Sequence, residues 1–210
     1  MRRALNRVNA RVNRAALDLL SVQPDDRLLD VGFGGGLILQ EALLRLPRGA
    51  VAGIEISEPM LELARRKAAK RGASQARFEW ADALELPYAE GSFDAVTVGF
   101  GVRNLVDLER GLAEMVRVLK PGGRAVILEI TQPRRRPLST FYSLWFDRIV
   151  PLLGALAGDR GAYTYLPESV KRFPPPAGLA AMMAGAGLER IHYLLLAGGI
   201  IAIHSGAKGR

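Results

Sequence analysis

The chain has 210 residues, of which 49% are hydrophobic and 24% are charged, and its formal net charge is +8. This length and composition predict a single globular domain over residues 1–210 that buries a full core. Because cysteine is absent, disulfides and cysteine-nucleophile chemistry are excluded. The two histidines are too few to hold a metal without carboxylate help, so we expect no metal. The positive charge favours an anionic partner, either nucleic acid or an anionic lipid surface.

The N-terminal segment, residues 1–22, is expected to form an amphipathic helix over residues 3–20. Its apolar side chains recur at steps of three and four residues, at Leu5, Val8, Val12, Ala15 and Leu19. Another face carries Arg7, Arg11 and Arg14. Two interpretations of this basic face stay open: it is simply solvated, or it serves at a membrane surface or as a cap over the site.

A glycine-rich loop follows the first predicted strand, residues 27–31. The strand ends with Asp30, and a D-x-G-x-G-x-G pattern then leads into a predicted helix over residues 37–46. Glycine allows a tight turn and the close approach of a ligand, and the helix directs its positive end to the same place. A dinucleotide-binding fingerprint is excluded, because its third glycine would fall on Leu37 or Leu39. The loop therefore predicts the first strand-to-helix turn of a different nucleotide-binding sheet.

This loop resembles motif I of the class I S-adenosylmethionine-dependent methyltransferases. The resemblance implies that S-adenosylmethionine, and its product S-adenosylhomocysteine, bind at Asp30, Gly32, Gly34 and Gly36. A second acid, Glu55, lies in the next predicted strand, residues 51–56. It follows the loop by about 20 residues, where a carboxylate can accept hydrogen bonds from ribose hydroxyls. We therefore expect Glu55 and its neighbour Ile56 to bind the cofactor; the alternative is a surface glutamate.

Two further strand ends carry candidate site residues. After a predicted helix over residues 58–70 and a strand over 76–80, Asp82 and Ala83 stand where side chains can reach an adenine edge. A strand over residues 93–98 then ends in Gly99-Phe100-Gly101-Val102-Arg103-Asn104. Ligands of open α/β sheets lie beyond the carboxyl ends of the strands, so we expect Gly99 to contact the cofactor and Arg103 and Asn104 to be functional. The alternative for these two is a loop salt bridge or a turn.

The remaining pattern predicts a helix ending at residues 120–123, a strand over 125–130, a helix over 177–186 and strands over 188–196 and 200–204. The fold class is therefore α/β: a doubly wound, mainly parallel, seven-stranded sheet. A helical insertion over residues 132–176 interrupts it and is expected to cover the substrate. The insertion is basic and aromatic, with Arg134–Arg136, Phe141, Tyr142, Trp145, Phe146, Tyr163, Tyr165 and Phe173.

Four segments give the chain a specific family resemblance. They are residues 100–104, 117–123, 163–169 and 197–204, which read FGVRN, RVLKPGG, YTYLPES and AGGIIAIH. The chain resembles the ubiquinone/menaquinone biosynthesis C-methyltransferases, a Rossmann-like class I family, over about residues 28–208. Two positions depart from it, because the family's loop usually has threonine at Gly35 and an acid at Leu37.

The resemblance implies methylation of a ring carbon of a prenylated quinol, such as demethylmenaquinol or a ubiquinone precursor. Arg103 would stabilise the phenolate, and Asp82 would act as the base through a water held by Asn104. Phe100, Arg103, Tyr163 and Tyr165 would contact the substrate. His204 is a weaker candidate for the base, with a buried structural histidine as the alternative reading.

Other functions and partners are weighed against this one. The nearest alternative is methylation of another small molecule or lipid. A nucleic-acid substrate is disfavoured, because residues 99–104 lack the Asn/Asp-Pro-Pro-aromatic segment of base-amine methyltransferases. No apolar run reaches the roughly 20 residues of a membrane span, and the N-terminus does not read as a secretory signal. We expect a cytoplasmic protein and leave open contact with the inner face of an anionic membrane, and a homodimer.

Overall fold

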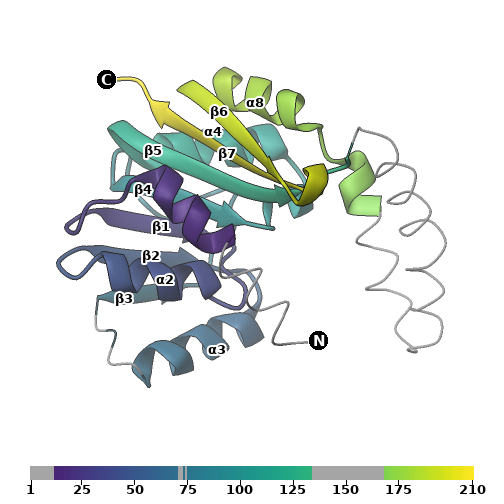
Figure 1. Ribbon diagram of the computed structural model, residues 1–210. Helices are drawn as coiled ribbons and strands as arrows, with labels where there is room; N and C mark the ends of the chain where they lie inside the picture. Colours follow the sequence, from purple (N-terminus) through teal and green to yellow (C-terminus); the bar gives the residue numbers. More distant parts are fainter. Residues whose placement is uncertain (1–11, 71–72, 74, 134–167) are drawn as a thin grey trace, which may run out of the picture.

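The computed structural model describes residues 12–70, 73, 75–133 and 168–210 (Figure 1). Within them, seven strands form one sheet in the order β3-β2-β1-β4-β5-β7-β6. The strands are β1 (Arg27–Val31), β2 (Ala50–Ile54), β3 (Ala76–Glu79), β4 (Phe93–Gly99), β5 (Leu119–Ile130), β6 (Leu188–Leu196) and β7 (Ile201–Lys208). Only β7 runs against its neighbours. The predicted mainly parallel, seven-stranded sheet is confirmed.

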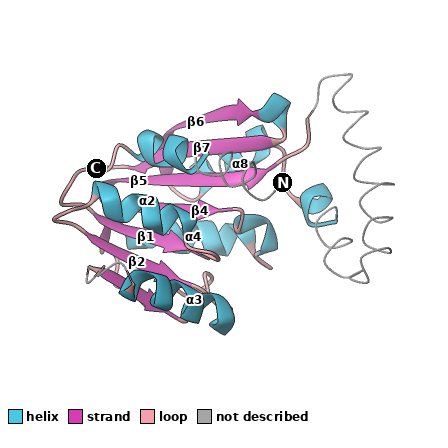
Figure 2. Ribbon diagram, turned by 60° about the horizontal axis from the view of Figure 1, so that its bottom comes forward, coloured by secondary structure: helices cyan, strands magenta, loops and turns pink. Residues whose placement is uncertain are grey.

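Helices cover both faces of the sheet (Figures 1 and 2). The labelled helices are α2 (Leu37–Arg45), α3 (Glu58–Ala69), α4 (Leu108–Val118) and α8 (Pro176–Gly185), and short 3-10 turns are η1 (Val102–Asn104) and η3 (Ala197–Gly199). A helix over residues 12–20 packs with α2 and α3 in one apolar cluster. Side chains of α4 and α8 form the cluster on the other face. This is the three-layer arrangement of a doubly wound fold.

The helix α4 illustrates how local sequence defines an element. Asp107 precedes it in an extended conformation and accepts a 2.9 Å hydrogen bond from the Arg110 N–H, which satisfies one of the free donors at the helix start. Leu112, Met115 and Val116 are buried along one side, at the three- and four-residue steps of a helix. The helix thus presents an apolar stripe to the sheet.

The order of the strands places a crevice between β1 and β4. From β1 the chain moves outward to β2 and β3 on one side, and then returns to β4 on the other side. The loops after these two strands therefore separate at the carboxyl edge of the sheet. Doubly wound sheets bind their ligands at this switch point.

The N-terminal helix differs from the prediction in the face that it buries. Ala16, Leu17 and Leu20 are fully buried, whereas Leu19, expected inside, is 41% exposed. The helix is rotated by about one position, because this orientation buries two leucines where the predicted face buries one. Within residues 12–20, the expected inward face is therefore right at Val12 and wrong at Leu19.

Two strands are longer than predicted. β5 begins at Leu119 because this residue pairs with Phe93, and the register then shifts so that Ala95 pairs with Arg124. Pro121 lacks an N–H and Gly122 has a φ of 75°, so the ladder is interrupted between those pairs. β7 continues to Lys208 because it has partners on both sides, β5 and β6.

His204 ties helix α8 to the sheet. It lies in β7 with 1% exposure, and its Nε2 is 2.8 Å from the carbonyl oxygen of Pro176, the first residue of α8. The carbonyl only accepts, so Nε2 carries the proton. Its Nδ1 is buried and has no hydrogen-bond partner. Burial lowers the pKa of His204, opposed by the bond to Pro176. The alternative reading, a buried structural histidine, describes this environment.

This burial predicts an acid-sensitive contribution to stability. His204 is neutral when folded and takes up a proton on unfolding below its unfolded pKa of about 6.5. Its contribution is complete above that pH and is lost as the pH falls, by up to about 1.4 kcal/mol per pH unit. Urea unfolding of the unmodified protein and of His204→Gln between about pH 7.5 and pH 5 measures it. Glutamine keeps a donor to Pro176 but does not titrate, so the variant should show a shallower decline. Equal declines in both proteins would contradict the assignment.

Candidate active site

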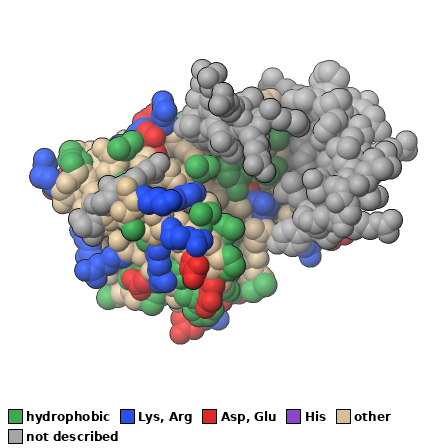
Figure 3. All heavy atoms as spheres, turned by 90° about the horizontal axis from the view of Figure 1, so that it is seen from below, with side chains coloured by type: hydrophobic (Ala, Val, Ile, Leu, Met, Phe, Trp, Pro, Cys, Tyr) green, Lys and Arg blue, Asp and Glu red, His purple; other side chains and the backbone are tan. Residues whose placement is uncertain are grey.

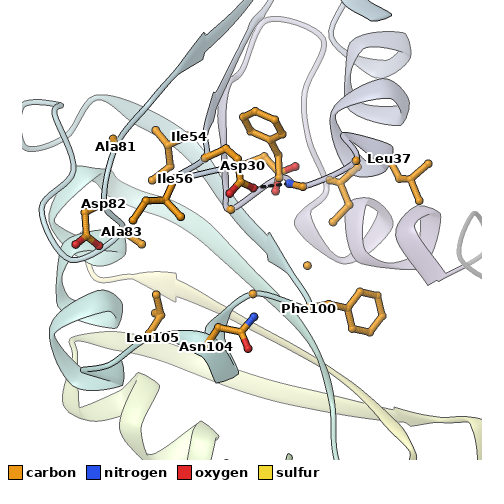
Figure 4. Close-up of a pocket in the computed structure, with 18 of the residues that line it drawn as sticks. Asp30, Leu37, Ile54, Ile56, Ala81, Asp82, Ala83, Phe100, Asn104 and Leu105 are labelled. Carbon is orange, nitrogen blue, oxygen red and sulfur yellow. Dashed lines mark hydrogen bonds between the residues drawn. The ribbon is translucent and has the colours of Figure 1, made fainter. Parts of the chain in front are cut away.

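A cavity of about 520 Å³ opens at the carboxyl edge of the sheet, at the ends of β1, β2, β3 and β4 (Figure 4). This volume is in the range of small-molecule sites. Its walls are formed by Asn13, Asp30, Gly32, Phe33, Gly34, Gly35, Leu37, Ile38, Ile54, Glu55, Ile56, Ala81, Asp82, Ala83, Leu84, Gly99, Phe100, Gly101, Asn104, Leu105 and Val106. The structure thus brings together residues predicted at four separate strand ends.

The glycine loop turns through left-handed backbone conformations. The φ angles of Gly32, Gly34 and Gly36 are 63°, 49° and 69°. A Cβ at Gly32 or Gly34 would meet no atom within 4 Å, so the conformation, and not the space, demands glycine there. Gly36 is the N-cap of α2 and does not line the cavity. Its conformation turns the chain so that α2 starts directly beside the loop.

Asp30 is a buried acid that faces the cavity. It is 1% exposed, and its Oδ1 has no hydrogen-bond partner. Burial raises the pKa of Asp30, and the nearby carboxylate of Glu55 raises it further. A buried carboxylate without a partner is costly unless a cation pairs with it. The site therefore suits a ligand with a positively charged group next to the end of β1.

Glu55 shapes the loop and also faces the cavity. It is 9% exposed, and one carboxylate oxygen accepts a 2.8 Å hydrogen bond from the Gly34 N–H. The other oxygen accepts from the Ser57 N–H at 3.0 Å. Each carboxylate oxygen has two lone pairs, so both can accept a further bond from a ligand hydroxyl. Glu55 can thus hold the glycine loop and a ligand together.

Ile56, Asp82 and Ala83 form one end of the cavity, and Leu37 and Phe100 lie toward the other end (Figure 4). Asp82 is exposed and accepts a 2.9 Å bond from the Leu84 N–H. Beside this end, the indole N–H of Trp80 donates to the Ile56 carbonyl at 2.8 Å and fixes the turn after β2. The end near Asp82 suits a planar group with polar edges.

The loop after β4 divides its residues between the cavity and the protein interior. Phe100 and Asn104 line the cavity, whereas Arg103 is not among its lining residues. The Arg103 Nη1 lies 2.6 Å from a carboxylate oxygen of Glu129 and also donates to the Phe100 carbonyl at 2.5 Å. Burial raises the pKa of Glu129, and Arg103 opposes this. The salt bridge that the sequence left as an alternative is present at Arg103.

The sequence analysis did not predict several of the residues that line the cavity. Asn13 reaches the cavity from the N-terminal helix and is 5% exposed. The available signal was that Asn13, a polar residue, directly follows the apolar Val12. Phe33, Leu105 and Val106 add apolar wall beside predicted positions. Tyr163 and Tyr165, with most of the insertion, lie outside the described residues.

Across residues 12–70, 73, 75–133 and 168–210, no group of three or more His, Asp or Glu side chains is arranged to hold a metal ion. In the same part of the chain, no helix has the length and apolar content that a membrane crossing requires.

The sheet order and the reversed β7 are those of the class I S-adenosylmethionine-dependent methyltransferase fold, and the cavity lies beside its glycine loop. The fold resembles that of a SAM-dependent methyltransferase from Aquifex aeolicus, with a TM-score of 0.65 and 18% identity over 93% of this chain and 88% of that one. The model of the ubiE/COQ5 methyltransferase family matches residues 9–208, and the chain belongs to that family.

Two relatives support this assignment at the level of sequence. The demethylmenaquinone methyltransferase of Thermus thermophilus is 48% identical over 94% of this chain and 90% of its own. The ubiquinone/menaquinone biosynthesis C-methyltransferase UbiE of Geobacter sulfurreducens is 41% identical over 96% of this chain and 80% of its own. The expected enzyme class and its methyl donor, S-adenosylmethionine, are confirmed.

Proposed function

We propose that the protein methylates a ring carbon of a prenylated quinol, with demethylmenaquinol as the first candidate and a ubiquinone precursor as the second. The observation that carries this proposal is the cavity, which has acids along the β1, β2 and β3 ends and an apolar wall at Leu37 and Phe100. The named relatives act in quinone biosynthesis by their descriptions, which supports the same substrate class.

The residues present fit S-adenosylmethionine. Asp30, buried and without a partner on Oδ1, matches the ammonium of the methionine part. Glu55 has lone pairs for the two ribose hydroxyls, and Asp82 stands beside an apolar end suited to the adenine. When bound, the cofactor supplies an electrophilic methyl group on a sulfonium. The chain's task is to hold donor and acceptor in line at near-attack distance and to exclude water.

The acceptor side requires a rise in electron density on the ring. The carbon beside a ring hydroxyl becomes nucleophilic as that hydroxyl loses its proton, so a proton acceptor and a stabiliser of the phenolate are needed. The resemblance implies Asp82 as the proton acceptor, through a water held by Asn104; for this one side chain, that role is the alternative to the adenine contact. Arg103, which lies behind the cavity wall and pairs with Glu129, is the proposed stabiliser of the phenolate. The new carbon–methyl bond forms as the sulfonium–methyl bond breaks, and the ring proton at that carbon leaves to water.

The test is methyl transfer from labelled cofactor to a panel of acceptors. Demethylmenaquinol, a demethylated ubiquinol precursor, a phospholipid and RNA are supplied separately, with quinones kept reduced. The expected product is a quinol labelled at a ring carbon, with the label resistant to acid and base. Label in the lipid or the RNA, or in no acceptor although the cofactor binds, would overturn the proposal.

Access to a prenylated substrate leads to a prediction about membranes. We expect reversible binding to anionic vesicles through Arg134–Arg136 of the insertion, with Phe141, Trp145 or Phe146 near the lipid. Each such charge contributes about 1 kcal/mol near an anionic surface and is screened within a Debye length. The basic face of the N-terminal helix is the other candidate for this contact. Of its arginines, Arg14 lies within the described residues; its side chain is 60% exposed and lies 3.6 Å from Glu41.

Co-sedimentation with vesicles at low and high salt measures this binding. Replacing all three arginines with glutamine should abolish it. The control replaces Arg65 and Arg66 of α3 and Lys70 directly after it; this face of the molecule carries acids beside its basic side chains (Figure 3). An equal loss in the control would show that only net charge matters. Absence of binding at low salt, or binding indifferent to the loss of Arg134–Arg136, would mean that these arginines are simply solvated.

A further inference from the structure

Phe100 holds a backbone conformation that is rare for a residue with a side chain. Its φ is 59°, in the left-handed region, and it lines the cavity. Such a conformation costs free energy, and it persists only where the surroundings hold it. Here the Phe100 N–H donates to the Leu128 carbonyl at 2.7 Å, and the Phe100 carbonyl accepts from Arg103 at 2.5 Å. Both sides of the residue are therefore held.

Glu129 holds the arginine that holds Phe100. It is 1% exposed, on β5 directly after Leu128. One carboxylate oxygen accepts from Arg103 Nη1 at 2.6 Å and from the Ile130 N–H at 2.8 Å. The other accepts from the Arg103 backbone N–H at 3.2 Å. Glu129 thus fixes both the side chain and the backbone of Arg103, while it does not itself line the cavity.

We propose that Glu129 is a positioning residue, which holds Arg103 and through it keeps Phe100 and Asn104 in place at the cavity wall. Phe100 and Asn104 come from one loop and both face the cavity (Figure 4). A shift of the loop would therefore move the wall against which the acceptor packs. This role in the reaction rests on the proposed function, but the geometry that it predicts does not.

The arrangement requires a carboxylate. Glu129 meets three N–H donors, and an ionised carboxyl group only accepts. Glutamine has the same shape, but its amide nitrogen would face the Arg103 backbone N–H in one orientation, and both Arg103 Nη1 and the Ile130 N–H in the other. Glu129→Gln should therefore release Arg103 without creating a cavity.

The chain offers a control with the same kind of ion pair in Glu114. This residue also pairs with an arginine, Arg117, at 2.6 and 2.8 Å, and also accepts a backbone N–H, that of Leu86 at 2.7 Å. Neither Glu114 nor Arg117 lines the cavity. Glu114→Gln therefore reproduces the loss of an arginine–glutamate pair away from the loop that holds Phe100.

The experiment compares both variants by amide hydrogen exchange and by quinol methylation. In Glu129→Gln the Phe100 amide should exchange at least about tenfold faster, because its bond to Leu128 opens more often. Quinol turnover should fall about 10- to 100-fold, while S-adenosylhomocysteine affinity stays within about threefold. Glu114→Gln should change none of these. If Glu129→Gln does not fold, Arg103→Lys keeps the charge, lacks the arginine fork, and should expose the Phe100 amide in the same way.

The outcomes separate the two proposals. Suppose that Glu129→Gln shows faster exchange at Phe100, but the unmodified protein itself methylates no quinol. This result would support the positioning role and overturn the proposed function. Unchanged exchange at Phe100 overturns the positioning role, whatever happens to turnover. A loss of cofactor affinity as large as the loss of turnover also overturns it, since that result would mean a general collapse of the cavity.

Discussion

Replacing Asn104 with alanine is expected to lower quinol turnover by about 100- to 1,000-fold, the usual cost of losing one preorganised polar group at a reacting centre. The affinity for S-adenosylhomocysteine should change little, because Asp30 and Glu55 lie at other strand ends. Steady-state methylation with a demethylated quinol gives the turnover, and calorimetry gives the affinity. A fall in turnover without a fall in affinity would place Asn104 on the acceptor side.

The control for this prediction is Gln23→Ala. Gln23 also carries an amide side chain, which donates to the Ser21 carbonyl in the loop before β1, at the opposite edge of the sheet from the cavity. Its loss should leave turnover unchanged. Near-normal turnover in Asn104→Ala would remove Asn104 from the mechanism.

Arg103→Ala should also depress turnover, but its effect has two sources. It removes a charge near the acceptor wall, and it leaves the buried Glu129 without its cation. Removing one partner of a buried ion pair costs about 3–5 kcal/mol of stability. Unfolding curves must therefore accompany the kinetics. This is why Asn104 is the cleaner probe of the chemistry.

The cofactor half of the site could be predicted because it depends on local spacing. The pattern from Asp30 to Gly36 specifies a turn by itself, and Glu55 follows from the rule that ligands gather at the carboxyl ends of parallel strands. These residues need no knowledge of which strands are neighbours across the sheet. The structure places Asp30, Gly32, Gly34 and Glu55 around one cavity.

The loop after β4 could be predicted only in part, because its geometry depends on the neighbouring strand. Glu129 meets Arg103 since β5 pairs with β4, with Gly99 opposite Leu128. Nothing within residues 99–104 predicts that Glu129 is the partner of Arg103. A signal was nevertheless present, because Glu129 interrupts an apolar strand, and a buried acid is almost always paired.

Which face of the N-terminal helix is buried could not be predicted from the sequence either. Its sequence supports more than one apolar face, and periodicity alone does not choose between them. The orientation is decided by packing against α2 and the sheet, which buries Leu17 and Leu20 and turns Asn13 toward the cavity. The same helix therefore contributes a site residue that its own pattern did not identify.

Glu55→Ala is expected to weaken cofactor binding by about 1–3 kcal/mol or more, roughly 5- to 150-fold, for two reasons that act together. It removes the acceptor for the ribose hydroxyls. It also frees the N–H groups of Gly34 and Ser57, so the glycine loop loses the side chain that fixes its position after β2. Calorimetric titration with S-adenosylhomocysteine measures the loss. Glu62→Ala is the control, because Glu62 is an exposed acid on α3 whose carboxylate lies 3.8 Å from Arg66, and it should leave the affinity unchanged. Unchanged affinity in Glu55→Ala would contradict both reasons: the ribose contact would lie elsewhere in the cavity, and the glycine loop would keep its position without this side chain.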